Sequence, residues 1–149
     1  MRPAVAQAIA EDEVQNAIAS GVFTGEFRLH VWTFPMLVID VASVSREMRF
    51  RLRVDFTDYD AQPVQLRLVN EDRIEIFDPF PLRNGQPFPN HQPAQLPQFF
   101  CITGTRDYYT HQGHNPQAGG PSWETHRQAH PARVVLHEVA HKFASGEWS

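Results

Sequence analysis

Residues Met48–Phe56 read Met-Arg-Phe-Arg-Leu-Arg-Val-Asp-Phe, and this stretch is the strongest indicator of the fold. Every second residue is apolar, and the residues between them are three arginines and an aspartate. Successive side chains of a strand point to opposite faces, so the pattern predicts a strand with one buried and one wet face. The predicted buried set is Phe50, Leu52, Val54 and Phe56, and the predicted wet set is Arg49, Arg51, Arg53 and Asp55.

Three further strands are predicted on either side of this one. Pro35 divides an apolar stretch into two predicted strands, Glu26–Phe34 and Met36–Ala42. A fourth, Val64–Val69, alternates again after a turn rich in Asp and Pro. Because no helical segment separates the four strands, an antiparallel meander is expected.

Helical periodicity marks both ends of the chain. Ala4–Ser20 is predicted to be a helix that ends at Gly21. Its apolar stripe is Val5, Ile9, Val14 and Ile18. Pro131–Ser145 is predicted to be a second helix, since proline suits the first turn. Its stripe is Val135, Leu136, Val139 and Phe143. We therefore expect an α+β fold, and 149 residues (1–149) fit one domain.

Composition excludes several classes of function. The net charge is −4, so the basic footprint of a nucleic-acid-binding surface is not expected. The longest apolar run, about Met36–Ile39, is far shorter than the roughly 20 residues of a membrane span. Cys101 is the only cysteine, so no internal disulfide can form and a cytoplasmic location is expected.

A proline-rich stretch leads to this lone cysteine. Six prolines fall between Pro79 and Pro97, which predicts an extended, irregular segment without internal ladders. Such long segments in small domains are often functional. Cys101 follows two phenylalanines, and two interpretations remain open: a buried core cysteine, or a reactive thiol or metal ligand near the surface.

The residues after Cys101 offer a potential metal site. Gly104–Pro121 is predicted to be a loop, and it carries an aspartate and two histidines close to the cysteine. Thiolate, carboxylate and imidazole are all zinc ligands, so Cys101, Asp107, His111 and His114 form a candidate set. The alternative is an exposed polar loop in a His-rich protein.

A second potential metal site lies near the C-terminus. His137-Glu138-Val139-Ala140-His141 matches the H-E-x-x-H pattern, in which two histidines of one helix bind zinc and the glutamate is the general base. However, both histidines are predicted to lie on the polar face of the helix, and only eight residues follow His141. We therefore expect no metal there, and a small zinc hydrolase is the third-ranked function.

The order of these elements resembles that of ubiquitin-conjugating (E2, UBC-like) proteins. Phe50–Phe56 and the turn Asp58–Val64 look like the third E2 strand and its tyrosine–proline turn. Phe88-Pro89-Asn90-His91 resembles the His-Pro-Asn element before the E2 cysteine, although Phe88 stands in place of the histidine. Trp123 also falls where E2 proteins often carry a tryptophan.

This resemblance implies an acyl-transfer enzyme. Cys101 would carry the C-terminus of a ubiquitin-like protein as a thioester, received from an E1-like activating enzyme. Asn90 would stabilise the oxyanion when a lysine attacks, with His111 and Asp107 as further catalytic candidates. The implied partners are these two proteins, and no cofactor is required.

The segment after the cysteine also resembles a bacterial family encoded beside ubiquitin-like genes. The similarity covers Phe99–His111 together with Trp123, His126 and Arg127. That family is predicted to bind metal through a cysteine, an acidic residue and two histidines. The resemblance implies Cys101, Asp107, His111 and His114 as zinc ligands, with Asp107 where a glutamate is expected. Two functions in one bacterial pathway thus stay open: the favoured E2-like enzyme, and a non-catalytic, UBC-like partner protein with or without zinc.

Overall fold

The computed structural model describes residues 2–43, 48–69, 82–83, 86–87, 102–110 and 122–144. The helices are α1 (Pro3–Ala19), α2 (Arg106–Thr110), α3 (Trp123–His126) and α4 (Ala132–Ala144). The strands are β1 (Phe27–Thr33), β2 (Met36–Ser43), β3 (Met48–Asp55), β4 (Gln65–Val69), β5 (Leu82–Arg83) and β6 (Gln86–Pro87). None of the helices in these ranges has the length and apolar character needed to cross a membrane.

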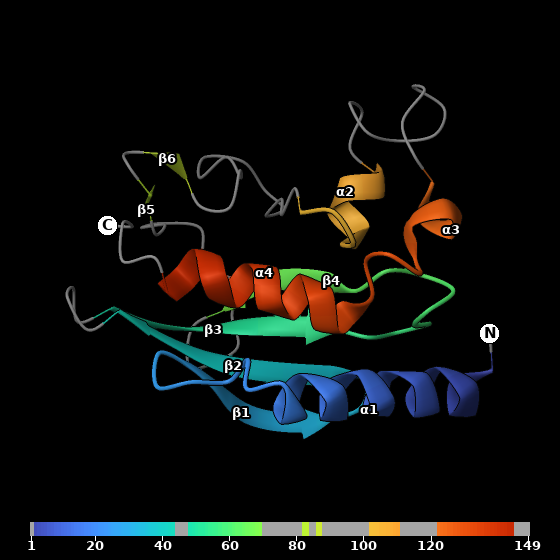
Figure 1. The fold of residues 1–149 in the computed structure, drawn as a ribbon, viewed down its shortest axis with the longest axis horizontal. Coiled ribbons are helices and arrows are strands. Elements are labelled where there is room, and N and C mark those ends of the chain that lie inside the picture. Colours follow the sequence, from blue (N-terminus) through green and yellow to red (C-terminus); the bar gives the residue numbers. More distant parts are fainter. Residues whose placement is uncertain are drawn as a thin grey trace.

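The first four strands form one antiparallel sheet in the order β1-β2-β3-β4 (Figure 1). The expected meander and the α+β class are therefore confirmed. Ile39 of β2 pairs with Leu52 of β3, which in turn pairs with Leu68 of β4. The apolar residues of successive strands thus lie on the same face of the sheet.

Helices α1 and α4 lie against this apolar face (Figure 1). Phe143 of α4 stacks on Phe27 of β1, with ring centroids 6.3 Å apart. The stripe predicted for the last helix is fully buried, as expected from its periodicity: Val135, Leu136, Val139 and Phe143. The core therefore lies between one helical layer and one sheet.

The predicted apolar stripe of α1 is partly wrong. Val5 and Ile18 are 46% and 44% exposed, while Ile9 packs at the border of the core and Val14 is buried. The buried face consists mainly of alanines: Ala6, Ala10 and Ala17. The stripe was misassigned because alanine is too weakly hydrophobic to stand out in a sequence pattern, although it packs well in a helix interface.

Strand β4 does not alternate as expected. All residues from Leu66 to Val69 are buried, including Arg67. The buried charge of Arg67 is compensated by an ion pair with Asp107 of α2, 40 positions later in the sequence. Such a distant partner leaves no periodic signal within the strand.

Two segments that were predicted to be irregular contain a helix or paired strands. The predicted loop Gly104–Pro121 begins with α2, in which Asp107 and Tyr109 are buried rather than exposed. The proline-rich segment was expected to lack ladders, but β5 and β6 pair across two residues each. In the sequence, Asn84-Gly85 stands between these strands, and such a dipeptide is typical of two-residue hairpins.

Candidate functional site

The structure describes one of the five predicted site residues, Asp107 of α2. Cys101, Asn90, His111 and His114 lie outside the described residues, so their roles remain predictions. Ile102, the residue bonded to Cys101, is the first described residue after the cysteine. We call residues 102–110 the post-cysteine segment.

The post-cysteine segment is attached to Val64, the residue that precedes β4. The Arg106 N–H donates to the Val64 carbonyl at 2.7 Å, within a parallel bridge between Val64 and Thr105. The Thr105 hydroxyl and N–H both donate to the Ile102 carbonyl, and the Ile102 side chain is buried. The backbone directly after Cys101 is therefore fixed by a buried side chain and by hydrogen bonds on both sides of a tight turn.

A glycine allows this segment to approach α4 closely. Gly104 has a φ of +94°, a conformation that residues with a side chain rarely adopt. A Cβ atom built at this position would lie 2.5 Å from Cγ2 of Val135 and 3.1 Å from the carbonyl oxygen of His130. Only glycine fits here without movement of the helix or of the segment.

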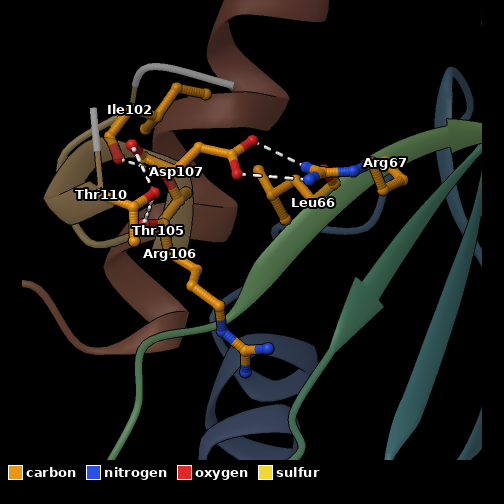
Figure 2. Close-up of polar contacts among 7 residues, drawn as sticks. All are labelled: Leu66, Arg67, Ile102, Thr105, Arg106, Asp107 and Thr110. Atoms are coloured by element: carbon orange, nitrogen blue, oxygen red, sulfur yellow. Dashed lines mark hydrogen bonds and ion pairs between the residues drawn. The ribbon is translucent and has the colours of Figure 1, made fainter. Parts of the chain in front are cut away.

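Asp107 forms a buried ion pair with Arg67 (Figure 2). Both terminal nitrogens of Arg67 donate to the carboxylate: Nη1 to Oδ2 at 2.7 Å and Nη2 to Oδ1 at 3.2 Å. Nη1 also donates to the Leu66 carbonyl at 2.6 Å, which fixes the direction of the guanidinium. Two parallel hydrogen bonds between charged groups give this contact a defined geometry.

This pairing bears on the predicted zinc set. Both Asp107 oxygens face the guanidinium of Arg67, so a zinc ion on this carboxylate would lie beside a fixed positive charge. Among the residues that the structure describes, no three His, Cys, Asp or Glu side chains converge as a metal site. The geometry gives Asp107 a structural partner that sequence reasoning missed, since Arg67 carries no local signal.

The two histidines of the H-E-x-x-H pattern lie where the sequence places them. His137 and His141 are both exposed on the polar face of α4. The Nε2 atom of His137 is 2.7 Å from the Ser20 hydroxyl, which donates to the Ala17 carbonyl at the end of α1. His137 thus contacts the other helix of its layer.

Tyr109 of the post-cysteine segment forms an aromatic cluster with Trp123 and His126 of α3. The Tyr109 hydroxyl accepts a hydrogen bond from the Gly104 N–H and lies 3.0 Å from Nδ1 of His126. Burial raises the pKa of Tyr109 to about 12, so its phenol is neutral at physiological pH. The Trp123 ring packs edge-on against Tyr109 at 5.6 Å, and its Nε1 donates to the Asp60 carbonyl. Trp123 and His126 therefore hold the segment in place.

The first turn of α4, against which Gly104 packs, is itself anchored by two distant residues. The Ala132 N–H donates to the Tyr59 hydroxyl at 2.8 Å, and the Arg133 N–H donates to Glu13 of α1 at 3.2 Å. Helix starts leave such N–H groups without partners inside the helix, so these contacts complete its hydrogen bonding. Burial strongly raises the pKa of Tyr59 and keeps it neutral. Neither contact had a signal in the sequence.

Comparison with known proteins assigns no family to this arrangement. No model of a protein family matches the sequence. No curated protein matches it at a significant level.

Proposed function

We propose that the protein is an E2-like component of a bacterial ubiquitin-like conjugation pathway, in which Cys101 carries the ubiquitin-like C-terminus as a thioester. The order of the elements supports this proposal most. Helix α1 precedes a four-stranded antiparallel meander, and the lone cysteine follows the proline-rich segment and precedes α4. This is the layout that the resemblance to UBC-like proteins implies.

The anchoring of the post-cysteine segment adds support. A thiol that exchanges acyl groups between two large partners needs a fixed position, because small misplacements cost much of the rate. The residues after Cys101 are held by β4, α4 and the aromatic cluster around Tyr109. In the proposed function, these anchored residues hold the cysteine that directly precedes them in position for the transfer.

The proposed chemistry has two transfers. The Cys101 thiolate attacks the carbonyl carbon of the thioester on the E1-like enzyme, and the thiolate of that enzyme leaves. A neutral lysine amine of the target then attacks the carbonyl carbon of the new thioester; the C–N bond forms, the amine proton passes to solvent, and the C–S bond breaks to release the Cys101 thiolate. In this scheme Asn90 donates a hydrogen bond to the oxyanion of the second step, and His111 is a further catalytic candidate. No resident cofactor takes part.

The presence of one cysteine makes the test simple. Purified protein is incubated with ATP, Mg²⁺, and a ubiquitin-like protein together with its E1-like activating enzyme from a bacterial conjugation pathway. We expect an adduct on a non-reducing gel that a thiol reductant removes. Cys101→Ala should form none, and Cys101→Ser should form none or an adduct that resists the reductant. A wild-type protein that forms no adduct, or an adduct that survives in Cys101→Ala, would overturn the proposal.

Metal analysis separates the alternatives. One bound zinc per chain, lost in both Cys101→Ser and His114→Ala, would favour a zinc-binding, non-catalytic partner protein of the same pathway. Zinc lost in His137→Ala instead would favour the hydrolase. The pairing of Asp107 with Arg67 argues against the first of these outcomes.

A further inference from the structure

The ion pair between Arg67 and Asp107 is an unusual way to stabilise a small core. The two side chains are only 7% and 11% exposed, so both charges have lost most of their hydration. Attraction between buried charges often does no more than offset that loss, and apolar side chains of similar size stabilise a fold as well or better. A large net gain in stability is therefore not expected from this pair.

The pair joins two rigid parts of the molecule. Arg67 lies in the middle of β4, where it pairs with Arg53 of β3, and its Nη1 is held by the Leu66 carbonyl. Asp107 lies in the first turn of α2, two residues after Thr105. Because the guanidinium cannot swing, its two hydrogen bonds fix both the distance and the orientation of α2 relative to the sheet.

The position of α2 determines that of the residue next to the cysteine. Thr105 directly precedes α2 and binds the Ile102 carbonyl through its hydroxyl and its N–H (Figure 2). A displacement of Asp107 would therefore move Thr105 and Ile102 together. Ile102 is bonded to Cys101, so the displacement would reach the proposed thioester carrier across one peptide unit.

We infer that Arg67 and Asp107 are positioning residues for the acyl transfer at Cys101. This inference rests on the proposed function. It also gives Asp107 a role other than ligand or catalyst: its carboxylate holds the post-cysteine segment at the angle that transfer requires.

Four variants test the inference, measured by thioester formation under single-turnover conditions. Arg67→Met and Asp107→Leu each remove one charge and fill the space with apolar atoms. Arg67→Lys keeps the charge but replaces the two-pronged contact by a single ammonium. The double variant Arg67→Met/Asp107→Leu removes both charges, so neither side chain is left buried without its counter-ion, and we expect the fold to be retained.

In Arg67→Met and in Asp107→Leu, we expect the transfer rate at saturating partner to fall about tenfold or more. The partner concentration that gives half of the maximal rate should change little. Arg67→Lys should retain more of the rate than Arg67→Met. The double variant should recover the urea midpoint of the wild type but not its rate. A purely structural pair would instead recover both together.

The outcomes separate the inference from the proposed function. If the wild type forms the thioester and the folded double variant forms it equally fast, the inference is wrong while the proposed function stands. If the wild type forms no thioester, both fall.

Discussion

Gly104 lies close to Val135 of α4 and to His130 just before it. Its positive φ disfavours any side chain, and an added methyl group would meet Val135 and His130. We expect Gly104→Ala to lower the free energy of unfolding by about 1–3 kcal/mol, because the added atom overpacks the contact. Urea denaturation measures this loss.

Gly25→Ala is the matched control for this substitution. A Cβ at Gly25 meets nothing within 4 Å, and its φ lies outside the left-handed region. Its unfolding free energy should stay within about 0.5 kcal/mol of the wild type. Equal effects at the two glycines would contradict the close contact at Gly104.

Tyr109 links stability to alkaline pH. Burial raises its pKa from 10.0 to about 12, so the folded state favours the neutral phenol. The resulting stabilisation is fully present below pH 10, the pKa of the unfolded state, and is lost as the pH rises towards 12. Tyr109→Phe should therefore lower the free energy of unfolding by about 1 kcal/mol at pH 8, and this difference from the wild type should be smaller at pH 11.

Urea midpoints of both proteins at these two pH values check the prediction. Tyr59→Phe should behave in the same direction, because burial also raises the pKa of Tyr59. A gap that stays constant between pH 8 and pH 11 would show that the phenol of Tyr109 ionises alike in both states.

Among the helices, α1 and α4 depend on one carboxylate at their junction. Glu13 accepts hydrogen bonds from the Arg133 N–H and from its guanidinium, and its negative charge lies at the start of α4. Glu13→Gln should lower the unfolding free energy by about 1–2 kcal/mol, because the amide loses the charge and one acceptor. Glu11→Gln, an exposed change on the same helix, should stay within about 0.5 kcal/mol. Denaturant titration of both variants is the measurement.

Helix α4 offers two valines that differ only in their surroundings. Val139 is fully buried, whereas Val134 is 40% exposed. Val139→Ala should cost about 2 kcal/mol through lost burial and the cavity left behind. Val134→Ala should be close to neutral in the same denaturation experiment, and equal losses would mean that α4 does not use this face for packing.

The meander and the terminal helices were predictable because their signals are local. Alternation in Met48–Phe56 and the 3.6-residue period in α4 both arise from one element facing one core. Helix α1 was found but its face was misjudged, since alanines form the contact. Helices α2 and α3 have five and four residues, too few to show a period.

The site was less predictable because its contacts connect distant positions. Asp107 was selected as a metal ligand or catalyst, and only the fold brings it to Arg67. Tyr109 and Gly104 were read as parts of a loop, although they fix the residues after the cysteine. Such roles depend on where the chain returns to the sheet, which no pattern within either segment records.

For the chain as a unit, we expect one cooperative unfolding transition. The buried core is a continuous cluster that joins α1, the sheet, the post-cysteine segment and α4. Elements that share one core lose their packing together. Far-UV circular dichroism and tryptophan fluorescence should therefore give the same urea midpoint. Two separated midpoints would contradict a single cooperative unit.

The register shift in β1 affects how readily the sheets of two copies of the protein can pair edge to edge. β1 lies at one edge of the four-stranded sheet, and His30 is inserted between Leu29 and Val31, where the pairing with β2 slips by one residue. His30 and Asp40 also place ionisable groups 3.3 Å apart beside the irregularity. A bulge and polar groups make an edge a poor template for a further strand. We therefore expect this edge not to add strands from other molecules when the protein is concentrated.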